Sequence, residues 1–306
     1  MDIFEKHQVR DLNLELLAKQ VVEGFIIGLH RSPFHGFSVE FAEHRLYNQG
    51  ESTKTIDWKV YARTNKLFSK KYEEETNLRC QIVIDHSSSM LLKANSEAGA
   101  GLSKLEFSAL AAASLMTLLQ KQRDAFGLSI FGESIETHTK AKSSNQHFKL
   151  LTVFLQKMLA DTSRKQTNAA AALHNIADSI HKRSLVVIFS DMFDDVDKQN
   201  ELFSALQHLK YSKHEVILFH VVNKDKEIDF DFDNRPYEFE DMETGERIKL
   251  QPNQIKAHYT QQVQSYTDAL KLKCLQYKID FVEADINKGF KEILQAYLIR
   301  RKKMNV

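Results

Sequence analysis

Side chains that carry oxygen follow directly after a short apolar segment. Ile82 to Ile84 are apolar and β-branched, which is typical of a buried strand, and Asp85, Ser87 and Ser89 come next at alternate positions. In an open α/β sheet, ligands bind beyond the carboxyl ends of the strands. Carboxylate and hydroxyl oxygens are the ligands that a hard cation such as Mg²⁺ prefers. The pattern Asp-x-Ser-x-Ser therefore predicts a divalent-cation site at this strand end.

Two later segments offer more oxygen ligands. Thr167 opens a predicted helix over residues 168–181, and Asp191 follows a second apolar strand over residues 185–189. Each has a plainer interpretation, because threonine is a common helix N-cap and aspartate is a common turn former. Parallel strands bring their carboxyl ends to one edge, so the sequence predicts one metal site from three segments: Asp85, Ser87, Ser89, Thr167 and Asp191.

Strand and helix patterns alternate from residue 79 onward. Strands are expected over 79–84, 125–131, 135–139, 185–189, 215–222 and 278–283, and helices over 103–121, 145–160, 168–181, 198–210, 253–277 and 287–301. This alternation predicts an α/β fold, with a doubly wound, mostly parallel sheet flanked by helices. Alternating acidic and aromatic residues near 226–252 predict a small antiparallel β insertion.

The N-terminal quarter has a different pattern. Helical spacing over 11–29 predicts an amphipathic helix docked on the main body, loops and turns are expected over 32–63, and a strand over 66–74. We therefore divide the chain into an N-terminal module, residues 1–76, packed on a main domain, residues 77–306.

Composition excludes several classes of protein. The 306 residues carry a net charge of +1, which gives no reason to expect nucleic acid or an anionic membrane as partner. No stretch has the roughly 18 uninterrupted apolar residues that predict a membrane span, and no secretory signal is visible. Cys80 and Cys274 lie in apolar surroundings, as reduced core thiols do. A cytoplasmic location is the resulting expectation.

The order Asp-x-Ser-x-Ser, then Thr, then Asp resembles the von Willebrand factor A fold and its metal-ion-dependent adhesion site. The resemblance covers about residues 79–225 and 253–300. It implies that Ser87, Ser89 and Thr167 coordinate Mg²⁺ (or Mn²⁺), while Asp85 and Asp191 act largely through water. It also implies an open coordination position that accepts a carboxylate from a partner protein.

A second resemblance lies upstream. Two motifs resemble the family catalogued as "domain of unknown function fifty-eight", which carries them ahead of a von Willebrand A domain: Glu40-Phe41-x-Glu43-x-Arg45-x-Tyr47-x-x-Gly50-Glu51 and Ile56-Asp57-Trp58-x-x-x-Ala62-Arg63. Glu51 and His86 depart from the usual family residues, aspartate and a small residue respectively. Genes of this family often lie near those of MoxR-type AAA+ ATPases, which implies such an ATPase as partner in assembly or chaperone-like work.

The upstream motifs combine a carboxylate with arginines and aromatic rings. Two roles stay open for them: an ion-paired clamp that holds the N-terminal segment to the main domain, or a partner-docking surface with aromatic and arginine anchors. The residues concerned are Arg45, Tyr47, Asp57, Trp58 and Arg63.

Enzyme motifs are missing from the sequence. There is no Gly-x-Ser-x-Gly elbow, no phosphate-binding Gly-x-x-x-x-Gly-Lys loop and no zinc motif. His86 lies between Asp85 and Ser87, but neighbouring residues on an extended segment diverge, so a catalytic triad is not expected and His86 is interpreted as a loop histidine. The preferred hypothesis is a non-enzymatic, metal-dependent protein-binding module. A Mg²⁺-dependent phosphohydrolase and a scaffold with a vestigial metal site are the alternatives.

Overall fold

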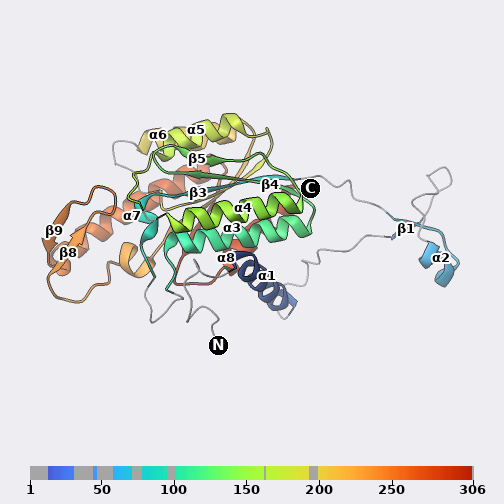
Figure 1. Ribbon diagram of the computed structural model, residues 1–306, viewed down its shortest axis with the longest axis horizontal. Coiled ribbons are helices and arrows are strands. Elements are labelled where there is room, and N and C mark those ends of the chain that lie inside the picture. Colours follow the sequence, from blue (N-terminus) through green and yellow to red (C-terminus); the bar gives the residue numbers. More distant parts are fainter. Residues whose placement is uncertain are drawn as a thin grey trace.

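A six-stranded sheet forms the centre of the molecule (Figure 1). The computed structural model describes residues 13–30, 44–46, 58–70, 78–94, 101–161, 163–192 and 199–304. The strand order is β10-β7-β6-β3-β4-β5, and every neighbouring pair is parallel except β4 with β5. The strands are β3 (Arg79–Asp85), β4 (Ala125–Phe131), β5 (Ile135–His138), β6 (Leu185–Ser190), β7 (Glu215–Val222) and β10 (Asp280–Asp285). The predicted α/β fold with a mostly parallel sheet is confirmed, and it is consistent with a von Willebrand A-like fold.

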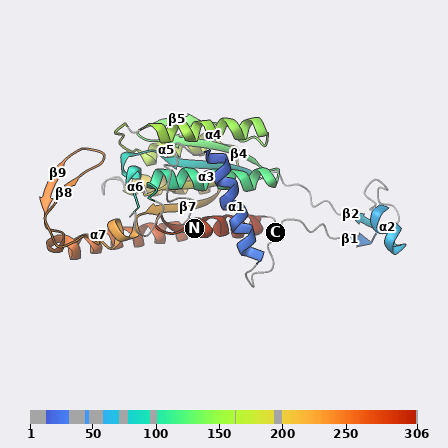
Figure 2. The same cartoon turned by 60° about the horizontal axis from the view of Figure 1, so that its bottom comes forward.

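Helices cover both faces of this sheet (Figures 1 and 2). One apolar core joins the sheet to α1 (Leu14–His30), α3 (Lys104–Lys121), α4 (Asn145–Ala160) and α8 (Lys291–Met304). The core on the other face involves α5 (Ala169–Ser179), α6 (Gln199–Tyr211) and α7 (Pro252–Gln276). The predicted docking of the N-terminal helix is confirmed, because Leu14, Leu17 and Val22 are buried against the first core. Cys80 and Cys274 are buried free thiols, as expected.

The direction of winding changes between β3 and β6. After β3 the chain adds β4 and β5 on one side and then returns to add β6, β7 and β10 on the other. Ile84 of β3 pairs with Phe189 of β6, so the residues that follow, Asp85 and Ser190, end the two strands side by side. Such a switch point leaves room for ligands beyond the carboxyl ends of the strands, because the adjoining loops diverge to opposite faces.

Strand β10 begins two residues later than its sequence pattern predicted. Helix α7 ends at Gln276, and Lys278 adopts a left-handed conformation with φ of 58°. A left-handed residue just past a helix end satisfies the last helical carbonyls and turns the chain, so the extended segment starts only at Asp280.

A hairpin departs from the body between β7 and α7. It begins with a π-helical turn, η5 (Lys224–Ile228), and continues through the antiparallel strands β8 (Tyr237–Glu240) and β9 (Arg247–Leu250). An aromatic cluster fixes it to α7: Phe230, Phe232, Tyr237, Phe239 and Tyr259. Both views show it at one end of the molecule, beside the start of α7 (Figures 1 and 2). The predicted β insertion is therefore present.

A small unit precedes the sheet in sequence. Strands β1 (His44–Leu46) and β2 (Phe68–Lys70) pair in antiparallel fashion, and α2 (Trp58–Thr64) lies between them in the chain. Strand β1 and helix α2 both correct the loops and turns expected over 32–63. Elements of three and seven residues are too short for apolar periodicity to reveal them. The division at residue 76 stays a prediction. In the described part of the chain, none of the helices combines the length and the apolar character that a membrane span requires.

Gly127 in β4 offers a test of how closely β4 packs against Gln81 of β3 and against Thr139. A Cβ atom there would lie 2.5 Å from Gln81 Oε1 and 2.6 Å from the Thr139 carbonyl oxygen. The Gln81 amide uses this space to donate to Ser129 Oγ and to the Thr139 carbonyl. We expect Gly127→Ala to lower the free energy of unfolding by about 1–3 kcal/mol, measured by urea denaturation.

Gly24→Ala is the matched control, because a Cβ at Gly24 in α1 meets nothing within 4 Å. Alanine is the better helix former, so this variant should gain up to about 1 kcal/mol. Equal effects of the two substitutions would contradict the packing described for Gly127.

Candidate metal centre at the strand tips

Asp85 ends strand β3 and is 1% exposed. Its Oδ1 accepts a hydrogen bond of 3.0 Å from the backbone N–H of Ser87, and its Oδ2 accepts one of 2.6 Å from the Ser190 hydroxyl at the tip of β6. The first bond turns the chain out of the strand, and the second joins the two strand tips. Both fix the orientation of the carboxylate.

Ser87 and Ser89 lie in the turn that follows β3. Their hydroxyl oxygens are 2.9 Å apart, so the two predicted ligands face each other. Ser88, between them, points elsewhere: its Oγ accepts a bond of 2.7 Å from the Lys165 N–H, and its own N–H donates to the Lys165 carbonyl at 3.0 Å. These two bonds attach the turn after β3 to the segment that carries Thr167.

Thr167 is 9% exposed, and its buried hydroxyl has no hydrogen-bond partner among the described residues. The alternative role of helix cap is wrong for this residue, because α5 is capped by Asn168, whose side chain accepts from the Ala171 N–H at 3.2 Å. A buried polar group without a partner costs about 1–3 kcal/mol. A bound cation at this position would supply the missing partner.

Asp191 follows β6 and is 1% exposed. Its Oδ2 accepts a bond of 2.7 Å from Lys104 Nζ, and the same ammonium group donates at 2.5 Å to Glu227 Oε1 in η5. Lys104 is the first residue of α3 and is fully buried. The predicted ligand Asp191 thus belongs to an ion triad around this buried ammonium group, Asp191–Lys104–Glu227, in which Glu227 is partly buried. We call it the lysine triad.

The charged groups at the strand tips shift one another's pKa values. Burial, reinforced by the negative charge of Asp191, raises the pKa of Asp85 to about 7. Burial alone would lower the pKa of Lys104, but the Asp191 and Glu227 carboxylates outweigh it and hold that pKa above its usual value. Burial also raises the pKa of Glu227. A positive charge near Asp85 would therefore favour its ionised form.

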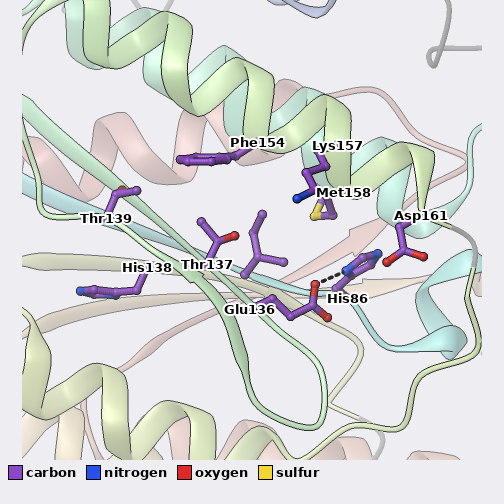
Figure 3. A pocket seen from close by; sticks show the side chains of 10 residues that line it. His86, Glu136, Thr137, His138, Thr139, Phe154, Lys157, Met158 and Asp161 are labelled. Atoms are coloured by element: carbon purple, nitrogen blue, oxygen red, sulfur yellow. Dashed lines mark hydrogen bonds and ion pairs between the residues drawn. The ribbon is translucent and has the colours of Figure 1, made fainter.

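His86 lies in the loop after β3, as expected, but its side chain is buried. Its Nδ1 lies 2.9 Å from Glu136 Oε2 (Figure 3). The same nitrogen lies 3.0 Å from Lys165 Nζ. It borders a cavity of about 520 Å³ between the edge strand β5 and the C-terminal half of α4, lined also by Phe154 and Met158. The imidazole thus contacts residues of two other segments, Glu136 of β5 and Lys165 before α5.

Two residues of the strand-tip region, Lys104 and Glu227, were not among the predicted site residues. Lys104 did leave a signal: a cation at the first position of a helix opposes the helix dipole, so it needs a specific partner. Glu227 left none, because it lies among other charged residues between β7 and the hairpin. Ser190, directly before the predicted ligand Asp191, also has a role at the site, because its hydroxyl donates to Asp85 Oδ2.

The structure describes little of the predicted clamp or docking residues in the N-terminal module. Tyr47 and Asp57 lie outside the described residues, and for Arg45 in β1 and Trp58 in α2 the structure describes the backbone alone. Arg63, near the end of α2, is exposed. Clamp and docking surface both stay predictions for this group.

The donors at the strand tips fit a hard cation. Within the described ranges, no group of three or more His, Cys, Asp or Glu side chains is arranged to hold a metal. The oxygens on offer are hydroxyls instead: the facing Ser87 and Ser89 and, on the segment bonded to their turn, Thr167, which has no partner among the described residues. Oxygen ligands of low total charge suit Mg²⁺ or Mn²⁺ that keeps some of its waters.

Comparison with known proteins gives a family match and distant relatives. The family model described as "Protein of unknown function DUF58" matches residues 43–268. "Uncharacterized protein Mb1516" of Mycobacterium bovis and "Uncharacterized protein Rv1480" of Mycobacterium tuberculosis are each 25% identical over 211 residues, which is 69% of this chain. The match spans 63% of the length of these relatives, so the chain covers less than two thirds of them.

Two solved structures resemble the chain with lower sequence identity. The conserved hypothetical protein BatB from Bacteroides thetaiotaomicron is 14% identical, with a TM-score of 0.47, over 73% of this chain and 98% of that one. An aerotolerance-related membrane protein from Bacteroides fragilis is 15% identical, with a TM-score of 0.46, over 74% of this chain and 99% of that one.

The raised pKa of Asp85 predicts how stability depends on pH without metal. Between about pH 4 and pH 7 the folded protein retains a proton on Asp85 that the unfolded chain has released, so stability falls as pH rises through this window. The difference in unfolding free energy between the wild type and Asp85→Asn should decrease by about 4 kcal/mol from pH 4 to pH 8. Urea denaturation in EDTA measures it, and parallel pH profiles of the two proteins would contradict the burial and charge described here.

Proposed function

Because this chain belongs to the family "Protein of unknown function DUF58", whose description names no activity, we propose its function from the strand-tip site. It is a metal-dependent protein-binding module of von Willebrand A type, in which Mg²⁺ or Mn²⁺ connects the protein to an acidic side chain of a partner. The observation that supports this most is the buried Thr167 hydroxyl, which has no partner among the described residues and lies on the segment bonded to the turn of the facing Ser87 and Ser89 hydroxyls.

The residues that would hold the cation are Ser87, Ser89 and Thr167 through their hydroxyls, with Asp85 next to them. Asp85 already has both oxygens engaged, by the Ser87 N–H and the Ser190 hydroxyl, and so contributes mainly charge and orientation. When bound, the cation would offer an open coordination position to an outside carboxylate. Neutral hydroxyl ligands leave much of its positive charge uncompensated, which favours binding of that acid.

The turn that carries the hydroxyls is held from two sides. The paired bonds between Ser88 and Lys165 attach it to the segment before α5, and the His86 imidazole is buried against Glu136. Ligands held by such contacts lose little conformational freedom when a metal binds. A preorganised site of this kind binds with less entropic cost than one on a free loop.

The proposed partner is a MoxR-type AAA+ ATPase, and the proposed role is assembly or chaperone-like work with it. The support is the family resemblance of the upstream motifs between residues 40 and 63. The chain would supply the acid-binding surface, and the ATPase would supply the acidic residue and the hydrolysis of ATP.

A metal-dependent phosphohydrolase is less favoured by the geometry. Such enzymes usually surround their metals with several carboxylates to activate water and the leaving group. Of the two candidate acids here, Asp85 is hydrogen-bonded on both oxygens and Asp191 is paired with Lys104.

Metal binding is tested by replacing both facing hydroxyls, Ser87→Ala with Ser89→Ala. Titration of the wild type with Mg²⁺ or Mn²⁺ at pH 8 should show one site by calorimetry. A free concentration 100 times the dissociation constant should stabilise the protein by about 2.7 kcal/mol. The double variant should lose both signals, because two of its neutral ligands are gone.

Ser88→Ala is the matched control on the same turn. It removes the bond to the Lys165 N–H but leaves the reverse backbone bond and the three predicted hydroxyl ligands. It should lower metal-free stability and keep the metal-induced gain. A wild type without any metal response would refute the proposed site and favour a scaffold.

Partner binding is tested by gel filtration with a purified MoxR-type ATPase in Mg²⁺ or in EDTA. Co-elution should require the metal and should disappear in the Ser87/Ser89 double variant. Co-elution that persists in EDTA would contradict metal bridging. Turnover of p-nitrophenyl phosphate that needs Mg²⁺ and vanishes in the same variant would instead support the phosphohydrolase.

A further inference from the structure

Lys104 is a buried cation at the tips of β3 and β6. Its ammonium group is fully buried and lies 2.7 Å from Asp191 Oδ2 and 2.5 Å from Glu227 Oε1. Burying an ammonium ion costs several kcal/mol unless close carboxylates compensate it, so this arrangement is specific rather than incidental. Its position matters because Asp191 was a predicted metal ligand.

The lysine triad competes with a metal for Asp191. An oxygen that accepts a short charge-assisted hydrogen bond in a dry environment does not readily exchange that donor for a metal bond. Displacing Lys104 from Asp191 would also deprive this fully buried ammonium group of a charge-assisted contact of 2.7 Å. The hydroxyls of Ser87 and Ser89, by contrast, bond to each other and are neutral, so a cation can replace that bond at low cost.

The triad also connects the strand tips to the hairpin. Glu227 lies in η5, and its second carboxylate oxygen accepts a bond of 2.7 Å from the Asn223 N–H at the end of β7. The Asn223 side chain donates to the Lys93 carbonyl beyond the Ser87–Ser89 turn. The position of the ammonium group is therefore fixed from α3, β6 and β7 at once.

We propose that Lys104 is an internal counter-ion that holds Asp191 out of the metal's coordination shell and so limits the site to hydroxyl ligands and Asp85. This inference rests on the proposed metal site. Lys104 acts as a positioning residue: it weakens metal binding and keeps the bound cation electrophilic toward the carboxylate of a partner. A purely structural lysine would stabilise the fold without any effect on metal affinity.

The test uses three variants of the full chain, titrated with Mg²⁺ and Mn²⁺ by calorimetry at pH 8. Lys104→Met releases Asp191 but removes the cation from both Asp191 and Glu227, and its metal-free form is expected to be much less stable. Lys104→Met combined with Glu227→Gln removes one charge of each sign. This double variant keeps the formal charge of the site, frees Asp191 and should fold. Glu227→Gln alone leaves Asp191 bound to Lys104 and serves as the control.

The double variant should bind Mg²⁺ at least about tenfold more tightly than the wild type, because a freed carboxylate replaces a water as ligand. Glu227→Gln should bind no more tightly than the wild type. Thermal melting should show a larger metal-induced shift for the double variant, which gives a second readout that does not depend on any partner.

Equal or weaker Mg²⁺ affinity in the folded double variant would overturn the inference and leave Lys104 a structural residue. Absence of binding in the wild type but binding in the double variant would refute the proposed function while supporting the role of Lys104. Absence of binding in every variant would refute both.

Discussion

The burial of carboxylates at the tips of β3 and β6 is the constraint on which the strand-tip site depends. Asp85 and Asp191 are each 1% exposed, and negative charge in such surroundings needs compensation. The protein compensates them differently. Asp191 receives the Lys104 ammonium, whereas Asp85 receives two hydrogen bonds from neutral groups and keeps a raised pKa. The electrostatic demand for a further cation therefore falls on the side of Asp85, where the serine hydroxyls lie.

The sheet provides this arrangement through its order of strands. Because the chain winds outward from β3 in both directions, the tips of β3 and β6 adjoin, and the segment before α5 reaches the same edge. The hydrogen bonds between Ser88 and Lys165 then fix the separation between the two hydroxyl-bearing segments. Glu227 extends the network to the base of the β8–β9 hairpin. A partner that contacts the hairpin would thus adjoin the strand tips as well.

Periodicity was enough to predict the sheet, its helices and the hairpin, because apolar runs such as 185–189 are long and their boundaries are sharp. The bounds of β10 were predicted two residues too early, because the left-handed residue Lys278 delays the start of the strand. Helix α2 was missed because its seven residues are too few to show a helical period. Motif spacing identified Asp85, Ser87, Ser89, Thr167 and Asp191 as candidates. Motif spacing did not identify Lys104 or Glu227. Their role comes from long-range contacts: Lys104 is 87 residues from Asp191 and 123 residues from Glu227 in the sequence.

The central claim is that a hard cation binds among hydroxyls at the strand tips while Asp191 stays paired with Lys104. Anomalous diffraction from crystals grown at pH 8 with Mn²⁺ tests it most directly, because the signal locates the metal without assumptions about its ligands. We expect one anomalous peak bounded by the hydroxyls of Ser87, Ser89 and Thr167, with the Lys104–Asp191 bond intact. A peak bonded directly to Asp191 with Lys104 displaced, or no peak at the strand tips, would contradict it.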